Sequence, residues 1–450
     1  MTVAHTLSRR ENPDSRTQSR APAHILFVHQ RLGAFGGAEA NIRITAEELG
    51  RRGHTLSLLY DEGSGKNEEG YRQLFSQCHR ISQNPREIRT LIAQRSADLI
   101  YLHSLSRLDL MGALFVSGIP IVRMVHDHSL YCLRNYKYNP LTRRPCSRPA
   151  SGYCIFPCAA PLARNRGGLL PLKWASFAKL RQEIDLNKQC EALIVYSQHQ
   201  KAELVANGFD PSRIHLHVPM ECRGNEHPLS NLSSRNLILF AGQIIRGKGV
   251  DLLLQALKNV QVPFECIIAG DGSHRAFCER LCRRLGLEAK VRFTGYLSPA
   301  ELERLYLEAS LFAFSSIWPE PFGMAGPEAM RFGLPVVGFD TGGVREWLID
   351  GENGFVAQWG NVHEFAQRMN DLLSNKELAR RLGLNGRARV NREYAAAGQI
   401  DLLEKLFAQA IDQHKLASRS MRLPATPMAS HSNNSTLLEA AQPPEPALNT

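Results

Sequence analysis

Short apolar segments alternate with helix-length segments along most of the chain. The apolar segments are rich in Ile, Val and Leu, which is typical of strands that are buried on both faces of a parallel sheet. Two series of strands are predicted. The first comprises His24–His29, His54–Tyr60, Ala97–His103, Ile119–His126 and Ala192–Ser197, and the second comprises Asn236–Gly242, Phe264–Gly270, Val291–Tyr296, Leu311–Ser315 and Leu334–Phe339.

The two series are separated by a segment that is rich in Gly, Pro, Asn and Ser and has no periodicity. We therefore predict an α/β protein with two tandem doubly wound, Rossmann-like domains that face a cleft, because ligands bind beyond the carboxyl ends of such strands. The predicted division is a disordered tail (1–22), an N-terminal domain (23–220) with a Cys-rich basic insert (130–168), a linker (221–234), a C-terminal domain (235–395), a helix that crosses back (396–416) and a second disordered tail (417–450).

The chain has 450 residues, of which 43% are hydrophobic and 22% charged, as in a globular protein. We expect no membrane-spanning helix, because no apolar run reaches about 18 residues. We expect no signal peptide either, since the first 22 residues lack an apolar core segment. A cytoplasmic location with ten reduced cysteines follows.

The net charge of +11 is concentrated in one segment. Between Arg123 and Arg181 there are eleven basic residues and one acid, Asp127. A local excess of this kind favours an anionic partner, such as a membrane surface, a lipid diphosphate or a phosphorylated acceptor. A nucleic-acid partner is not expected, because the segment lacks a known binding motif.

Two carboxylates bracket the loop Glu320–Glu328, which follows a predicted strand and opens a short helix. Free amides and the positive end of a helix dipole would face this loop. One carboxylate could take sugar hydroxyls, and the second could take a pair of hydroxyls such as those of a ribose. The alternative is that Glu328 is only a favourable first-turn acid and Glu320 a solvated loop residue.

Three other segments place glycine or charge at predicted strand ends. Gly36 and Gly37 precede a helix, where glycine lets a substrate approach the backbone, although a plain tight turn is the alternative. His126 ends a strand, where ligands bind, or else it is a histidine satisfied by backbone groups. The turn from Gly242 to Gly249 contains Arg246 and Lys248 and would cradle phosphate, unless it is simply a solvated basic turn.

The order of these motifs resembles the glycosyltransferases of family 4, which have the GT-B fold and retain anomeric configuration. The resemblance covers about residues 24–410. It rests on Gly36-Gly37 with Glu39, His126-Asp127, Gly242 to Gly249, Ala269-Gly270-Asp271-Gly272, Phe293-Thr294-Gly295, Glu320-Pro321-Phe322-Gly323 and Thr341-Gly342-Gly343.

The resemblance implies that the N-terminal domain binds the acceptor and the C-terminal domain the nucleotide-sugar donor. Glu320 would then bind the donor sugar, Glu328 the ribose, Lys248 the diphosphate, and His126 the sugar near the reacting centre. The amides near Phe322-Gly323-Met324 could stabilise the leaving diphosphate, as Lys248 would. Candidate catalytic residues are thus His126, Lys248 and Glu320, and the candidate donor-binding residues are Gly36, Gly37, Gln243, Arg246, Lys248, Phe322, Gly323, Met324 and Glu328.

One residue departs from the family pattern. Gln243 stands where the family usually has Arg, and Gln donates hydrogen bonds but carries no charge. Arg246, in the same turn, could replace that charge. No catalytic cofactor is expected, because the chain has no D-x-D motif that would place a metal on the diphosphate. Front-face displacement is what the resemblance implies for the mechanism.

Four cysteines, Cys132, Cys146, Cys154 and Cys158, fall in the irregular insert. In a cytosolic protein they could form a structural tetrathiolate zinc site. An iron–sulfur cluster and a set of reduced thiols that pack the insert are the alternatives. The segment Leu169–Arg181 directly after the insert has helical spacing, and the resulting basic helix would lie either in a membrane interface or on its own sheet.

The sequence thus predicts a retaining glycosyltransferase that moves a hexose-like sugar from a nucleotide donor to a glycan or lipid-linked acceptor, in cell-surface polysaccharide biosynthesis. It would act in the cytoplasm, at the inner face of the plasma membrane. Two alternatives stay open. One is a non-catalytic glycan- or lipid-binding protein of the same fold, and the other is a different nucleotide-sugar enzyme, such as an epimerase or a synthase that makes a free disaccharide.

Overall fold

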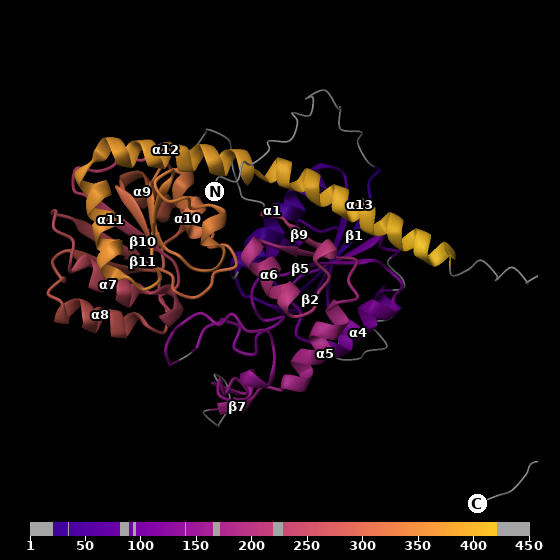
Figure 1. Ribbon diagram of the computed structural model, residues 1–450. Coiled ribbons are helices and arrows are strands. Elements are labelled where there is room, and N and C mark those ends of the chain that lie inside the picture. Colours follow the sequence, from indigo (N-terminus) through magenta and orange to yellow (C-terminus); the bar gives the residue numbers. More distant parts are fainter. Residues whose placement is uncertain are drawn as a thin grey trace, which may run out of the picture.

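Two parallel β-sheets with flanking helices form the body of the protein (Figure 1). The computed structural model describes residues 21–34, 36–81, 90–92, 96–139, 141–164, 172–218 and 228–420. Predicted strands of the first series lie in one sheet and those of the second series in the other. The predicted α/β class with two Rossmann-like sheets is therefore confirmed.

The first sheet has seven strands in the order β3-β2-β1-β4-β5-β8-β9, and each neighbouring pair is parallel. The carboxyl ends of its central strands consequently meet at one edge. The strands are β1 (His24–Leu32), β2 (Thr55–Gly63), β3 (Gln77–Arg80), β4 (Leu99–Leu102), β5 (Ile121–Met124), β8 (Ala192–Val195) and β9 (Ile214–Leu216). The accompanying helices are α1 (Gly37–Arg51), α2 (Glu68–Arg72), α4 (Leu108–Val116), α5 (Phe177–Asn187) and α6 (Gln198–Ala206).

The second sheet has six strands in the order β12-β11-β10-β13-β14-β15, again all parallel. The strands are β10 (Leu237–Ala241), β11 (Glu265–Ala269), β12 (Val291–Gly295), β13 (Leu311–Phe314), β14 (Val336–Phe339) and β15 (Gly354–Ala357). The helices are α7 (Val250–Leu257), α8 (Arg275–Arg284), α9 (Pro299–Glu308), α10 (Ala325–Arg331), α11 (Val362–Ser374) and α12 (Lys376–Glu393).

Three strands at the edges of the sheets, β3, β9 and β15, were not among those predicted. Strand β3 reads Gln-Cys-His-Arg and is only partly buried, and β9 has three residues. Strand β15 is buried but has only four residues and begins with Gly354. Because an edge strand pairs on one side only, its sequence need not carry a long apolar run.

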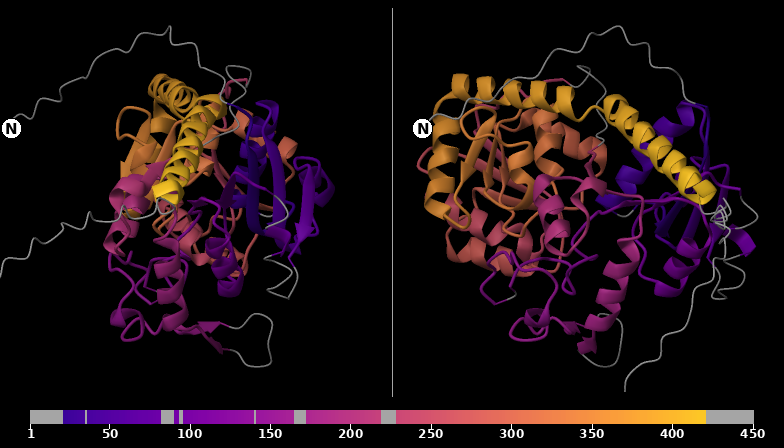
Figure 2. Two further views of the ribbon diagram at one scale, coloured as in Figure 1. Left: turned by 90° about the vertical axis from the view of Figure 1, so that its right-hand side faces the viewer. Right: turned by 45° about the vertical axis from the view of Figure 1, so that its right-hand side comes forward.

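A long irregular segment joins β5 to α5 and projects from the first domain (Figures 1 and 2). We call the described residues 130–139, 141–164 and 172–176 the insert. It contains a short 3-10 helix, Gly152–Cys154, and an antiparallel hairpin of β6 (Leu162–Arg164) and β7 (Leu172–Trp174). Residues 165–171 lie outside the described residues.

The predicted helix over Leu169–Arg181 is wrong, because Trp174 lies in β7 opposite Leu162. Helix α5 begins only at Phe177. The Oγ of Ser176 accepts a hydrogen bond from the amide of Lys179 at 3.2 Å, and this N-cap fixes the start of the helix. The helical spacing of apolar residues in the sequence thus continues across Ser176, although the residues before it form a strand and only those after it form a helix.

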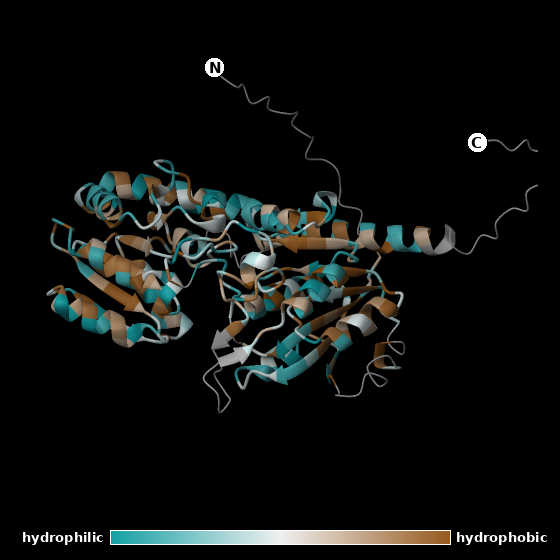
Figure 3. Cartoon of the chain, turned by 60° about the horizontal axis from the view of Figure 1, so that its bottom comes forward, coloured by the Kyte–Doolittle hydropathy of each residue, from teal (hydrophilic) through white to brown (hydrophobic). Residues whose placement is uncertain are grey.

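Helix α13 (Ala396–Ser420) returns from the second domain and lies along the first (Figure 1). Apolar and polar residues alternate along α12 and α13 (Figure 3), and α13 buries Leu403, Leu406 and Phe407. The ring of Phe407 lies 5.0 Å from that of Tyr101 in β4. One apolar core thus continues from the second sheet through α13 to one face of the first sheet. The helix extends four residues into the predicted tail 417–450, and residues 421–450 lie outside the described residues.

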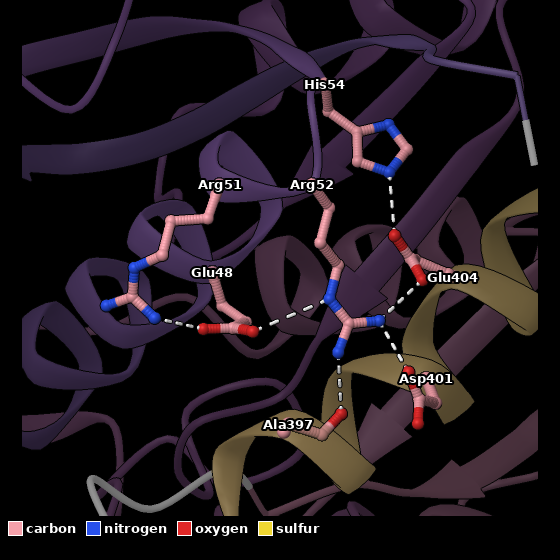
Figure 4. A network of polar contacts seen from close by, with 7 residues as sticks. All are labelled: Glu48, Arg51, Arg52, His54, Ala397, Asp401 and Glu404. Atoms are coloured by element: carbon pink, nitrogen blue, oxygen red, sulfur yellow. Dashed lines mark hydrogen bonds and ion pairs between the residues drawn. The ribbon is translucent and has the colours of Figure 1, made fainter. Parts of the chain in front are cut away.

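A polar network fastens the start of α13 to the end of α1 (Figure 4). Arg52 Nη1 donates to Asp401 at 2.5 Å and to Glu404 at 2.8 Å, and its Nη2 donates to the carbonyl of Ala397 at 2.9 Å. His54 Nε2 lies 2.9 Å from the other oxygen of Glu404. The crossing of α13 is therefore held by polar contacts at its start, by apolar packing along its length, and by His414 near its end, which contacts Glu191 and the carbonyl of Gly118. No helix in the described part of the chain is long and apolar enough to cross a bilayer.

Candidate active site

A cleft of about 1580 Å³ lies between the carboxyl ends of the two sheets. Most of the predicted site residues line it, namely His126, Lys248, Glu320, Gly36, Gly37, Gln243, Phe322, Gly323, Met324 and Glu328. Arg246 and the cysteines Cys132, Cys146, Cys154 and Cys158 are not among its lining residues. The cleft therefore collects residues that are up to 292 positions apart, because both sheets turn the same end toward it.

Lys248 and Glu320 form an ion pair in the C-terminal half of the cleft. The Nζ of Lys248 lies 2.5 Å from Oε1 of Glu320, which also accepts a hydrogen bond from Ser316 Oγ at 2.7 Å. The Lys248 ammonium also lies 5.5 Å from the centre of the Trp318 ring. Glu320 is only 4% exposed, so its carboxylate is held in one place with a cation directly above it.

The turn that carries Lys248 is pressed against the end of β13. Gly249, directly after the 3-10 helix Arg246–Lys248, has φ of +65°, and a Cβ at this position would meet the carbonyl oxygen of Ser315 at 2.0 Å. Only glycine fits this backbone. Ser315 Oγ in turn donates to the carbonyl of Lys248 at 2.9 Å. This contact brings Lys248 to the loop that contains Glu320.

Glu328 lies in the first turn of α10 and also lines the cleft. Burial raises the pKa of Glu328 to about 7, and the charge of Arg331 only partly opposes this. The carboxyl group is therefore divided between its two protonation states near neutral pH. Its neighbour in the cleft, Tyr306, has a buried hydroxyl without a hydrogen-bond partner among the described residues.

Gln243 and Arg246 are separated by the fold of their turn. Gln243 is exposed in the cleft, whereas the Arg246 side chain is exposed outside the cleft lining. The carbonyl of Arg246 accepts a hydrogen bond from Arg143 Nη2 at 2.6 Å. Arg143 also holds Asp251 at the start of α7 through two bonds, of 2.5 and 3.0 Å. A residue of the insert thus braces the turn that presents Lys248.

His126 lies across the cleft, at the carboxyl edge of the first sheet. Its Nδ1 lies 2.7 Å from the hydroxyl of Tyr196, and its Nε2 lies 2.8 Å from Nδ1 of His103. Burial and the charges of His29 and Arg123 hold the pKa of His126 well below its usual range, so the ring is neutral at pH 7. Both ring nitrogens are engaged, and a hydrogen bond from His126 to a ligand requires one of these two bonds to open.

Gly36 and Gly37 leave the N-terminus of α1 open to the cleft. A Cβ at Gly37 would meet nothing within 4 Å, and one at Gly36 would meet only Glu39 Oε2 at 3.6 Å, so packing does not require either glycine. Glu39 accepts hydrogen bonds from the Gly36 amide at 2.9 Å and from His29 at 3.2 Å. Burial opposes its ionisation, but these bonds together with the charge of His29 lower the pKa of Glu39. The carboxylate is thus ionised and shapes the glycine turn.

Further contacts join the domains around the cleft. His128 Nε2 lies 2.5 Å from the carbonyl oxygen of Pro319 and its Nδ1 lies 2.7 Å from the hydroxyl of Tyr131. Burial lowers the pKa of His128 to about 4, so the ring is neutral and can donate only one proton. Glu346, at the end of the 3-10 helix Gly342–Glu346, accepts a hydrogen bond from the Gln198 amide at the start of α6, at 2.6 Å.

The four insert cysteines do not converge on a common point. Among the residues that the structure describes, no three His, Cys, Asp or Glu side chains are placed to hold a metal ion. All four are free and half-buried. This arrangement does not fit the predicted tetrathiolate zinc site.

Three side chains in this region were not singled out from the sequence: His29, His103 and Tyr196. Each lies at or beside the end of a predicted strand, and the strand-end rule that selected His126 would have found them. The contacts of Arg143 with Asp251 and the Arg246 carbonyl had no signal in the sequence, because they depend on how far the insert extends toward the second domain.

Comparisons with known proteins identify related sequences and a shared fold. A family model described as Glycosyltransferase Family 4 matches residues 35–217, and one described as Glycosyl transferases group 1 matches residues 225–389. Spore coat protein SA of Bacillus subtilis is 31% identical over 201 residues, which are 42% of this chain and 53% of that protein. The GDP-mannose-dependent alpha-(1-6)-phosphatidylinositol monomannoside mannosyltransferase of Mycolicibacterium smegmatis is 27% identical over 202 residues, which are 40% of this chain and 53% of that protein.

The chain spans about half of the length of these curated relatives. Among solved structures, Anabaena HepE in complex with UDP and glucose superimposes with a TM-score of 0.67 and 19% identity. The superposition covers 86% of this chain and 100% of HepE, which shows that the two share a fold.

The raised pKa of Glu328 predicts a pH-dependent stability. Between its usual pKa of 4.5 and about 7, the unfolded carboxyl is ionised whereas the folded one keeps its proton. The folded state should therefore lose up to about 3 kcal/mol as the pH rises through this window. Glu328→Gln should raise the free energy of unfolding at pH 8 and leave it unchanged at pH 4, as measured by urea denaturation. Glu377→Gln, at an exposed first-turn glutamate of α12, is the control. Equal curves for native protein and Glu328→Gln at pH 8 would contradict the raised pKa of Glu328.

The contacts of Arg143 with Asp251 and the Arg246 carbonyl predict that replacing Arg143 costs much more stability than replacing the adjacent Arg144. Arg143→Ala leaves Asp251, which is 5% exposed, without its bidentate partner, so we expect a loss of about 2–4 kcal/mol in the free energy of unfolding. Arg144→Ala, at an exposed neighbouring position, should cost less than about 0.5 kcal/mol. Similar effects of the two substitutions would show that the insert does not support the turn.

Proposed function

Because the chain belongs to glycosyltransferase family 4 and has the GT-B fold, we propose that it transfers a sugar from a nucleotide-sugar donor to an acceptor bound in the N-terminal half of the cleft. The observation that carries the proposal is the Lys248–Glu320 pair, which puts a cation and a hydroxyl acceptor side by side at the edge of the second sheet. His126 faces the same cleft from the first sheet. A sugar diphosphate offers the matching groups, an anion beside a ring of hydroxyls.

The C-terminal half of the cleft is proposed as the donor site. Lys248 takes the diphosphate, Glu320 the sugar hydroxyls and Glu328 the ribose. As the diphosphate leaves, negative charge grows on its oxygens, and Lys248 with the amides near Gly323 stabilises that charge. Gln243 contributes a neutral hydrogen-bond donor from the cleft wall. UDP is the first nucleotide to test, because HepE was solved with UDP and glucose.

Transfer with retention of anomeric configuration is proposed for the reaction. The carboxylate of Glu320 is held by Lys248 and Ser316, so it serves better as an orienting group than as a free nucleophile. This favours attack by the acceptor hydroxyl on the face from which the diphosphate departs. NMR of the first-formed product distinguishes the outcomes, since a product with the inverted anomeric configuration excludes front-face displacement.

A membrane-associated glycan or lipid-linked oligosaccharide is proposed as the acceptor, in the assembly of cell-surface polysaccharide at the inner face of the membrane. The insert exposes large apolar side chains, namely Leu141 (85%), Ile155 (48%), Phe156 (84%), Leu162 (48%) and Trp174 (73%). The sequence from His128 to Arg181 contains no Asp or Glu. Exposed apolar groups within a purely basic segment suit the interface of an anionic bilayer.

The proposed membrane contact predicts binding to vesicles. Sedimentation with anionic phosphatidylglycerol vesicles should show binding that fades with salt, since each well-placed basic residue contributes about 1 kcal/mol. Phe156→Ser with Trp174→Ser should weaken it. The control pair is Val116→Ser with Leu416→Ser, at 78% and 64% exposed positions outside the insert. Equal loss in both pairs, or equal binding to neutral vesicles, would assign the partitioning to general hydrophobicity.

The proposed chemistry predicts a specific role for Lys248. Lys248→Ala should lower single-turnover transfer by roughly two to three orders of magnitude, as for other preorganised charge stabilisers. Lys258→Ala, at an exposed position at the end of α7, should leave the rate unchanged. The donor is first chosen by thermal shift against a panel of nucleotide sugars, because a ligand of the folded state raises its stability. An unchanged rate in Lys248→Ala would remove this residue from the diphosphate site.

A further inference from the structure

Arg123 is a buried arginine that has no hydrogen-bond partner among the described residues on two of its nitrogens. It lies in β5, three residues before His126, is 3% exposed, and lines the cleft. Its Nε and Nη1 make no hydrogen bond to any residue in the described part of the chain. Its ion-pair partner is Glu183 of α5, whose Oε1 lies 3.7 Å from Nη2, too far for a hydrogen bond.

A buried guanidinium with unsatisfied donors lowers the stability of the folded protein unless another group binds it. Guanidinium stays ionised in proteins and presents five N–H donors in a planar fork. A buried charge without good hydrogen bonds destabilises the protein by several kcal/mol. Glu183 compensates weakly, because burial raises the pKa of its carboxyl despite the nearby charges of Arg123 and Lys179. The free donors of Arg123 are therefore suited to an anion that enters from the cleft.

The wall around Arg123 fits the same kind of ligand. Lys179 is exposed in the first turn of α5 and lines the cleft. Its charge, like that of Arg123, favours the ionised form of the Glu183 carboxyl and so opposes the rise in its pKa. Trp174, which is 73% exposed, also lines the cleft and offers an apolar face. The competing carboxylate of Asp127 is engaged, since its Oδ1 accepts a hydrogen bond from the Ser129 amide at 2.8 Å.

We propose that the N-terminal half of the cleft binds an acceptor that carries an anionic group, a phosphate or a carboxylate, held by Arg123 with Lys179 at the entrance. The fork of Arg123 matches either group through two parallel hydrogen bonds. Because Arg123 lies deeper along β5 than His126, the anion anchors the acceptor while a hydroxyl of the acceptor lies at the reacting centre. This inference rests on the proposed function and specifies its acceptor.

Binding measured without turnover tests it separately from catalysis. Calorimetry on the full chain saturated with UDP, so that the donor half is filled, would use geranyl diphosphate as the phosphate probe and methyl glucuronide as the carboxylate probe. Geraniol and methyl glucoside are the matched neutral references. One anionic probe should bind at least about tenfold more tightly than its own reference, and which probe does so identifies the anion.

The variants then locate the anion. Arg123→Gln and Lys179→Ala should each weaken binding of the preferred probe by about tenfold or more, and Arg123→Lys should fall between native protein and Arg123→Gln. Arg181→Ala removes a charge from the same helix outside the cleft lining and should change nothing. If Arg123→Gln does not fold, Lys179→Ala and Arg123→Lys decide the matter.

Three results would overturn the inference. They are anionic probes that bind no better than their neutral references, binding that is equal in native protein and the folded Arg123 and Lys179 variants, and binding that is seen only without UDP. UDP binding to each variant is measured in a separate titration. A failure of the donor site is therefore seen as lost UDP affinity, and a failure of the anion site as lost probe affinity alone.

Discussion

The cleft depends on helix α13, which follows the second domain in sequence and packs against the first. Two parallel sheets can turn their carboxyl edges toward each other only if the domains are held in a fixed relation, and α13 supplies much of that restraint. Its apolar face continues the core of the second domain onto the first sheet, where Phe407 packs against Tyr101. At its start, Arg52 binds two carboxylates and a carbonyl of the helix. Apolar packing and polar contacts thus both hold α13 against the first domain.

The insert and His128, which lies just before it, restrain the cleft from the opposite side. Arg143 reaches from the insert to the first turn of α7 and to the carbonyl of Arg246, and His128 contacts the carbonyl of Pro319, one residue before Glu320. Both contacts end on backbone or side chains directly beside the Lys248–Glu320 pair. A segment that belongs to the first domain in sequence therefore positions groups of the second. The proposed donor and acceptor sites are consequently linked through the same few contacts.

The strand pattern predicted most of the fold because a buried parallel strand needs a run of apolar residues whatever its neighbours are. The same pattern placed Lys248, Glu320 and His126 in one cleft, since strand ends of parallel sheets meet at one edge. It failed at Trp174, where helical spacing continued by chance across the cap at Ser176. It also could not find the role of Arg143, because the partner Asp251 is 108 residues away and no local rule specifies the path of an irregular loop.

The contact between Glu346 and α6 bears on how such proteins can recombine. The first turn of α6 belongs to the N-terminal domain, but one of its free amides is satisfied by a carboxylate of the C-terminal domain. Neither half is thus a complete module, although each has its own sheet. A hybrid that joins this N-terminal half to the C-terminal half of a relative would lose this contact, and the exposed amide would turn to water, unless the relative brings an acceptor to the same place. Swapping halves between relatives therefore removes a helix cap that spans the two domains.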